Sequence, residues 1–387
     1  MKKLSIFSIL LLVALLLAGG CKNNEENPLS GKGTKDKPYL INNAADLEKF
    51  SELINTGTAP YANTGKNYRL TADISMPTST TIAGNTVNLT PIGTEAKKFC
   101  GNFDGNGKTI SGLTIKKIAT NFIGLFGCVE GGSIKNLGLT NVDIKGYYRT
   151  GGIAGSVTDC NITGCYVTGT VSGVSYIGGI AGEMENSSIT YCYVTGTVSG
   201  NESCVGGIAG GIAHDMQGDI SNCYTACSVI GGIRDFTGGI AGSATNIKNC
   251  YAIGKITGGY SCGGIVGYNY GTVSGCVALN PSITGSNYLG RVVGQNFSTT
   301  AKLTNNAGLK TMTVNGGTIS NVDDTSINGK NIIKEDATKK STYEEAPYSW
   351  AFGNSDTAPW KWSIGNYTLP VFYWQTNAPD MPAHLKP

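Results

Sequence analysis

Short alternating runs of hydrophobic and polar residues recur along most of the chain. They are clearest in ITGCYVTGTVSG at 162–173, ITYCYVTGTVSG at 189–200, ISNCYTACSVIG at 220–231 and IKNCYAIGKITG at 247–258. β-Branched and aromatic residues dominate these runs and glycines interrupt them, a composition typical of short strands. Because the repeat shows no helical periodicity, it predicts an all-β fold.

A five-residue motif marks the period. GGIAG stands at 151–155, 178–182, 206–210 and 238–242, and GGIVG follows at 263–267. When GLFG ending at Gly127 and GRVVG ending at Gly294 are included, the final glycines lie 25 to 32 residues apart. A period of about 27 residues is too short for a four-stranded propeller blade. It fits two or three short strands, which is one coil of a parallel β-helix.

Equivalent residues of stacked coils form ladders at the parallel strand spacing of about 4.8 Å. The repeated glycines then mark a corner where φ is positive or where backbones approach too closely for a Cβ atom. The isoleucines between those glycines should form one buried ladder, made of Ile153, Ile180, Ile208, Ile240 and Ile265.

The flanks of the repeat predict two caps. In AADLEKFSELIN, the residues Leu47, Phe50, Leu53 and Ile54 fall on one helical face, which suits a helix that covers the open end of the solenoid. The repeat fades past about residue 300, and the last 38 residues contain all four tryptophans: Trp350, Trp360, Trp362 and Trp374. We therefore predict a Trp-rich C-terminal cap.

The N-terminus has the pattern of a secretion signal. An apolar run from Leu4 to Leu17 follows two lysines, and it is too short for an ordinary membrane span. AGG before Cys21 resembles a bacterial lipobox, although Ala18 stands where a strict lipobox has Leu. This resemblance implies that Cys21 carries a lipid that attaches the protein to a membrane.

The residues after Cys21 predict where the anchored protein lies. Glu25 and Glu26 resemble the acidic tag of surface-exported lipoproteins in some Gram-negative gut bacteria. We therefore expect an outer-membrane location at the cell surface. The polar stretch up to residue 37 is a tether between the lipid and the fold.

The repeat resembles the GLUG repeat of bacterial surface proteins over about 125–295. GGIAG followed by I-x-N-C-Y-x-x-G-x-V-x-G carries the resemblance, and YRLTADI and FDGNGKTISGLTI upstream also resemble such proteins. GLUG repeats occur in adhesin-like proteins and in one group of IgA-cleaving metallopeptidases. The resemblance implies a surface protein with an adhesin-like role.

Five segments follow from these patterns. They are a lipoprotein signal peptide at 1–20, a lipid-anchored tether at 21–37, an N-terminal cap helix with the first coils at 38–122, the GLUG-repeat β-helix at 123–300, and the last coil with a C-terminal cap at 301–387. The predicted fold is a parallel β-solenoid of about 27-residue coils.

The chain contains twelve cysteines, and five of them follow the repeat: Cys165, Cys192, Cys223, Cys250 and Cys276. They can be read as a metal or redox site, or as small apolar residues that fill a narrow core. Because no C-x-x-C pair occurs, we favour the core interpretation. We predict no metal site and no cofactor.

Aromatic residues also follow the repeat. If the ladder cysteines point inward, the tyrosines after them point outward: Tyr166, Tyr193, Tyr224 and Tyr251. A second set precedes the glycine motif: Tyr148, Tyr176, Phe236, Tyr260 and Tyr288. Both sets are candidates for a ligand-binding face that docks sugar rings. The alternative is that the rings stack on one another and only stabilise the solenoid.

Residues for catalysis are harder to find. The metallopeptidase relatives need H-E-x-x-H, but this chain has only His214 and His384, neither in such a motif. A carbohydrate-active β-helix enzyme would instead need converging carboxylates. The candidates are Glu183, Glu185, Asp215 and Asp219. We expect no enzymatic activity.

Composition narrows the range of partners. Only 14% of the residues are charged and the formal net charge is +3, which argues against a nucleic-acid partner. The favoured hypothesis is a non-catalytic, lipid-anchored surface protein that binds a host or bacterial glycan or glycoprotein. The first alternative is a carbohydrate-active β-helix enzyme or a glycan-capturing component, and the second is a structural spacer.

Overall fold

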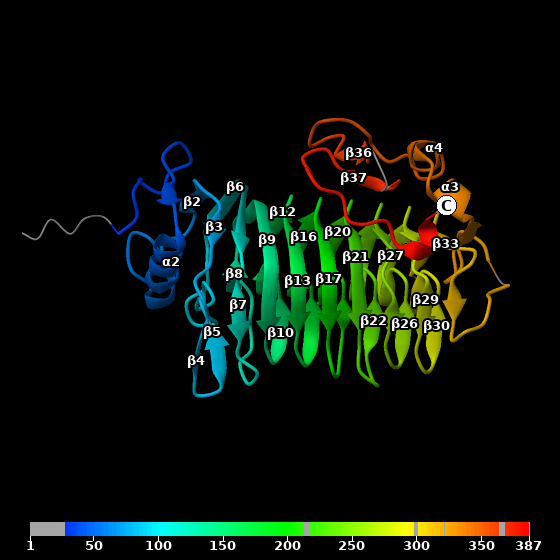
Figure 1. Cartoon of the computed structure of the whole chain (residues 1–387), viewed down its shortest axis with the longest axis horizontal. Coiled ribbons are helices and arrows are strands. Elements are labelled where there is room, and N and C mark those ends of the chain that lie inside the picture. The colour runs from blue at the N-terminus through cyan, green and yellow to red at the C-terminus, as the bar shows by residue number, and fades with distance from the viewer. Residues whose placement is uncertain (1–27, 213–216, 298–300, 321, 364–367, 387) are drawn as a thin grey trace, which may run out of the picture.

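The computed structural model describes residues 28–387 except 213–216, 298–300, 321, 364–367 and 387. The predicted signal peptide and Cys21 therefore lie outside the described residues. Strand accounts for 48% of the structure and helix for 7%, in a parallel β-solenoid of about ten turns. Figure 1 shows the coils stacked along the long axis of the molecule. The predicted fold class is confirmed.

A typical coil contains four short strands, one or two more than its length suggested. One coil consists of β10 (Tyr148–Gly151), β11 (Ala154–Thr158), β12 (Asn161–Thr163) and β13 (Tyr166–Ser172). The next consists of β14 (Ser175–Gly178), β15 (Ala181–Glu185), β16 (Ser187–Thr190) and β17 (Tyr193–Ser199). Equivalent strands pair in parallel, so that Ile162 lies opposite Ile189 and Tyr166 opposite Tyr193. The repeated sequence thus places identical residues one above another.

The additional strand of each coil precedes the glycine motif. These strands form their own six-stranded parallel sheet, which continues from β10 and β14 through β18 (Val205–Gly206), β22 (Phe236–Gly238), β26 (Ser261–Gly263) and β30 (Tyr288–Gly290). The remaining strands of these later coils are β19 (Ala209–Ile212), β20 (Gly218–Ser221), β21 (Tyr224–Ile230), β23 (Ala241–Lys248), β24 (Tyr251–Ala252), β25 (Ile256–Thr257), β27 (Val266–Ser274), β28 (Val277–Ala278), β29 (Ser282–Thr284) and β31 (Val293–Asn296).

The two ends of the solenoid are less regular. The first coils contain β1 (Tyr39–Ile41), β2 (Asn67–Leu70), β3 (Ile74–Ser75), β6 (Asn102–Ser111), β7 (Thr114–Lys116), β8 (Phe126–Glu130), β9 (Ser133–Lys145) and an antiparallel hairpin of β4 (Thr80–Ile82) and β5 (Asn85–Val87). The last coil contains β32 (Lys302–Thr304), β33 (Ala307–Leu309), β34 (Thr313–Val314) and β35 (Lys330–Ile332).

The glycine corner is explained by close approach. The predicted isoleucine ladder is fully buried, and the glycines beside it lie against the backbone of the next coil. A Cβ atom on Gly179 would stand 2.4 Å from the carbonyl oxygen of Gly207. Positive φ falls instead on the residues before the motif, such as Arg149 and Tyr176 at 56° and 57°.

The repeated cysteines fill the core. All five have no exposed surface and are free thiols. Each Sγ atom lies 3.2 to 3.5 Å from the carbonyl oxygen two residues earlier. They pack as small side chains inside each coil.

A helix covers the N-terminal end, as expected. In α2 (Ala44–Thr56), Leu47, Phe50, Leu53 and Ile54 are buried. The Asn43 side chain caps the first turn by accepting a hydrogen bond from the Asp46 N–H, and Gly57 ends the helix at φ 71°. Figure 1 places this helix across the first coils.

The C-terminal segment does not close the far end as the sequence suggested. After β35, the described residues 334–363 and 368–386, here called the C-terminal strap, turn back along the flank of the solenoid (Figure 1). The strap contains α3 (Lys334–Ala337), α4 (Lys340–Glu344), β36 (Trp360–Trp362), β37 (Pro370–Phe372) and a 3₁₀ turn at Ala383–Leu385. Among the described residues, its strands β36 and β37 form an antiparallel pair internal to the strap.

Candidate functional site

The tyrosines after the ladder cysteines form one aromatic column on the outside of the coils. Consecutive rings of Tyr166, Tyr193, Tyr224 and Tyr251 lie 4.8, 5.0 and 4.9 Å apart and within 5° of parallel. The strand spacing sets these distances, because each tyrosine occupies the same position of its coil.

A second aromatic column from the strap covers most of the first. Trp350, Trp360, Phe372 and Trp374 stack in this order at 4.8, 4.8 and 5.2 Å. Rings of the two columns approach to between 5.6 and 6.5 Å.

This contact changes the predicted ligand-binding face. Tyr224 and Tyr251 have no exposed surface and Tyr193 has 7%. The Tyr251 hydroxyl donates to the Pro370 carbonyl oxygen at 2.5 Å, and the Tyr224 hydroxyl bonds the Gln375 side chain. The prediction that these three tyrosines are open to a ligand is therefore wrong in this structure, because the strap occupies their faces.

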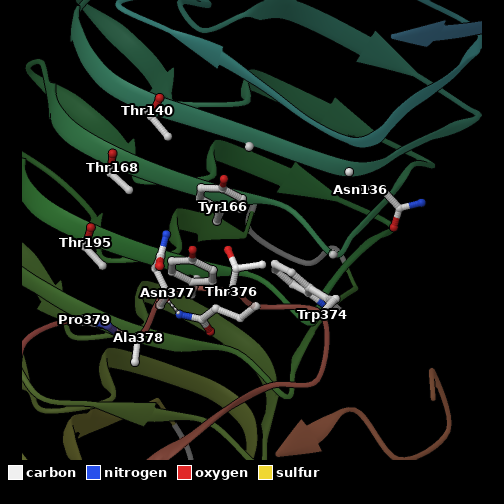
Figure 2. Close-up of a pocket in the computed structure, with 15 residues that line it drawn as sticks. Asn136, Thr140, Tyr166, Thr168, Thr195, Trp374, Thr376, Asn377, Ala378 and Pro379 are labelled. Atoms are coloured by element: carbon white, nitrogen blue, oxygen red, sulfur yellow. Dashed lines mark hydrogen bonds between the residues drawn. The ribbon is translucent and has the colours of Figure 1, made fainter. Parts of the chain in front are cut away.

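Tyr166 ends the column and remains partly exposed. In the preceding coil the equivalent position is Gly138, which has no side chain to continue the stack. A groove of about 530 Å³ opens there. Figure 2 shows Tyr166 and Trp374 lining it, and their rings are 6.2 Å apart and 24° from parallel.

Uncharged polar groups line the rest of the groove. Thr140, Thr168 and Thr195 follow one another on successive coils at one side, and Thr376 and Asn377 come from the strap (Figure 2). Thr168 Oγ1 accepts from the Asn141 N–H at 3.1 Å. Within the described part of the chain, the side chains of the other four make no hydrogen bond, so these groups are available to a ligand.

Charged side chains lie beside the groove and are not part of its described lining. Burial, and then the negative charge of Asp73, raise the pKa of the Tyr166 hydroxyl. The lining residue Asn136 donates to Asp104 at 3.2 Å. Asp104 in turn pairs with Arg69 at 3.4 Å and Lys135 at 3.8 Å.

The second predicted aromatic set does not form one surface. Tyr148 lies opposite Ser175, and Tyr288 lies opposite Ser261. Tyr148 and Tyr260 therefore belong to one column of positions, and Tyr176, Phe236 and Tyr288 to the neighbouring one. Tyr260 and Tyr288 contact each other at 5.2 Å, Phe236 stacks on Tyr268 at 4.6 Å, and Tyr176 lies beside the Arg149 guanidinium. None of these residues lines the groove.

The candidate carboxylates do not gather around the groove either. Glu183 pairs with Arg149 and its side chain is 14% exposed. Glu185 ends the same strand, β15, whereas Asp219 is exposed on β20. Asp215 lies outside the described residues.

The described residues hold neither a metal-ligand cluster nor a membrane-spanning helix. No three or more His, Cys, Asp or Glu side chains there are grouped as metal ligands. The same residues contain no helix with the length and apolar character needed to cross a membrane.

Sequence reasoning found Tyr166 but missed the residues that complete the groove. Trp374, Thr376 and Asn377 come from the strap, and no periodic signal connects them to the coils. One signal was present in the repeat, because Gly138 stands where later copies carry the tyrosine.

The fold and the groove together define a β-solenoid with a ligand-sized groove between the coils and a strap. Residues 146–172 and 173–199 match the model of the GLUG motif, so the predicted recognition of this repeat is confirmed. The crystal structure of a "putative immunoglobulin A1 protease" from Bacteroides ovatus has a similar fold, with a TM-score of 0.60 and 24% identity over 89% of this chain and 95% of that one.

Two curated relatives share part of the sequence. Halomucin from Haloquadratum walsbyi is 34% identical over 132 residues, which are 33% of this chain and 1% of halomucin. A "Putative Gly-rich membrane protein" from Evansella cellulosilytica is 34% identical over 111 residues, which are 28% of this chain and 12% of that protein. The matched region is thus a small part of each relative.

Proposed function

We propose that this protein is a non-catalytic, lipid-anchored surface protein that binds a glycan in the groove between the strap and the coils. The observation that carries the proposal is the wall of Tyr166 and Trp374 beside hydroxyl and amide groups without partners. Sugars offer an apolar ring face and several hydroxyls, so they match a site with aromatic walls and a few polar groups.

The size of the groove fits this role. Ligand sites usually enclose about 300–1,000 Å³, and the groove measures about 530 Å³. The coils are continuous ladders of parallel strands, so their threonines and Tyr166 are held in place before the ligand arrives. This preorganisation lowers the entropy cost of binding.

The lining favours binding over hydrolysis. Glycosidases use a pair of carboxyl groups that flank the bond to be broken. The described residues that line the groove include no Asp, Glu, His, Lys or Arg. A bound saccharide would therefore meet no general acid or base there.

The proposed location depends on the leader and on Cys21. The name of the Evansella relative contains the words membrane protein, which agrees with a membrane attachment. Metabolic labelling with a radioactive fatty acid tests it: the native protein should be labelled and Cys21→Ser should not. Digestion of intact cells by an added protease should remove the solenoid, and full protection would contradict a surface location.

A glycan array with soluble residues 28–387 tests the binding proposal. Tyr166→Ala and Trp374→Ala should each remove selective binding, whereas Tyr288→Ala should not. Tyr288 is a suitable control because it is 44% exposed and lies outside the groove. Equal binding by all four proteins would show that the groove is not the site. An array without any selective signal would contradict glycan binding.

A further inference from the structure

We infer that the groove selects uncharged saccharides and packs a sugar ring against Tyr166, at the end of the aromatic column where Gly138 carries no ring. This inference rests on the proposed function and makes it specific. It concerns both the chemical class of the ligand and the position of one of its rings.

The aromatic column of the coils ends at Tyr166. Within it, Tyr193 covers one face of Tyr166 at 4.8 Å. Among the described residues, the only other ring recorded against Tyr166 is Trp374, at 6.2 Å. On the side of Gly138 no aromatic ring continues the stack, and the Tyr166 ring itself lies over this glycine, with Cζ 2.4 Å from where a Cβ atom would stand. A pyranose ring in the groove would pack against the part of the Tyr166 ring that lines it.

Polar side chains from the coils and from the strap surround Tyr166 in the groove. Thr140 belongs to the same coil as Gly138, and Thr195 belongs to the coil beyond Tyr166. Thr376 and Asn377 reach the groove from the strap. These groups can donate and accept hydrogen bonds around the edge of a sugar ring, where its hydroxyls lie.

The uncharged lining of the groove disfavours an acidic ligand. An acidic sugar would bring a carboxylate or sulfate into a groove whose described lining holds no cation. Removing such a group from water without a partner is unfavourable. Asp73 already acts on Tyr166 with a negative charge, and the nearby Arg69 and Lys135 are paired with Asp104. The ammonium of Lys361, behind the lining residue Gln375, donates to the Tyr373 and Gln375 carbonyl oxygens. An uncharged sugar avoids both the cost of burying an anion without a partner and the repulsion by Asp73.

Titration calorimetry with matched saccharides tests the inference. A neutral oligosaccharide that binds on the array is compared with the uronic-acid oligosaccharide of the same linkage. The neutral compound should bind at least about tenfold more tightly. Its Kd should change less than about twofold between low and high salt, because no ion pair is screened.

Gly138→Ala tests the position of the sugar ring. A Cβ atom there would stand 2.4 Å from Cζ of Tyr166, so the Tyr166 ring must leave its place at the groove. Affinity for the neutral saccharide should fall at least about tenfold, whereas melting temperature and far-ultraviolet circular dichroism confirm that the variant folds. A folded Gly138→Ala variant with native affinity would overturn the inferred position.

Thr195→Lys tests the charge argument independently of folding losses. It should add affinity for the uronic-acid oligosaccharide, and this gain should disappear at high salt. Thr284→Lys, which places the same charge on exposed β29, is the matched control and should add none. If the native protein prefers the acidic compound through Tyr166, the inference is wrong and the glycan site stands. If no saccharide binds through Tyr166, the proposed function itself fails.

Discussion

At the scale of single residues, Asp235 is a buried carboxyl group in an unfavourable environment. It precedes β22 and has no exposed surface. The Gly232 N–H donates to one carboxyl oxygen, and the other oxygen has no partner among the described residues. Burial raises the pKa of this carboxyl to about 6. The native state is therefore poorly suited to the ionised form.

Asp235→Asn should stabilise the protein at neutral pH. Because the native pKa lies above the unfolded one, the carboxyl favours folding most below about pH 4, and this contribution is lost as pH rises through about 6. Urea titrations should show a free energy of unfolding about 2 kcal/mol higher for the variant at pH 7.5. The gain should shrink towards pH 4.

The exposed Asp219→Asn is the control for this prediction, because its side chain lies in solvent. It should leave the free energy of unfolding nearly unchanged at both pH values. A variant Asp235→Asn that is less stable than the native protein at pH 7.5 would show that the ionised carboxylate is needed by the fold.

Substitution of a repeated glycine should destabilise the fold. Gly179→Ala would place its Cβ atom 2.4 Å from a backbone oxygen of the next coil. Backbone cannot move aside locally, so the cost should be about 1–3 kcal/mol. Gly317→Ala is the matched control, because its nearest atom would be 3.5 Å away. Thermal unfolding of both variants measures the difference, and equal melting temperatures would contradict the close-approach explanation.

At the scale of elements, the strap is attached to the coils by side chains. Trp350 Nε1 donates to the Gly275 carbonyl oxygen at 3.2 Å, and Trp360 Nε1 donates to Asn222 at 3.3 Å. The described strands of the strap pair only with each other. Stacked aromatic rings and side-chain hydrogen bonds therefore hold the strap against the coils.

Trp360→Ala should loosen the strap without unfolding the coils. Trp360 is fully buried between Trp350 and Phe372, and removal of a buried Trp side chain costs about 3–5 kcal/mol. Limited proteolysis should then cut within the strap, and glycan affinity should fall because Trp374 loses its support. The control Tyr288→Ala should be cut like the native protein. Native-like resistance of Trp360→Ala would show that the strap docks by other contacts.

The coils could be predicted from the sequence, whereas the position of the strap could not. The period of the repeat predicts the coil, because a residue that recurs with this period occupies the same position in every coil. It therefore also predicts the inward cysteines and the outward tyrosines. The contact between Tyr224 and Gln375 joins residues 151 apart in sequence and has no period. Tyr166 could therefore be predicted as a site residue, whereas its partner Trp374 could not.

At the scale of the whole molecule, the two parts differ in how their backbone is held. Each coil is hydrogen-bonded to the coils on both sides, so its amides should open only when neighbouring coils separate. In the described part of the strap, the paired strands are the short antiparallel β36 and β37. Local opening of the strap should therefore need less free energy than opening of the solenoid.

Hydrogen exchange followed by mass spectrometry measures this difference directly. Strap amides should exchange at least about a hundredfold faster than amides of β13, β17 and β21, which corresponds to about 3 kcal/mol. Saccharide at a hundred times its Kd should add up to about 2.7 kcal/mol of protection, concentrated in peptides that contain Tyr166 and Trp374. Uniform exchange of strap and coils would mean that they open as one unit. Protection confined to the coils would mean that the strap takes no part in holding the ligand.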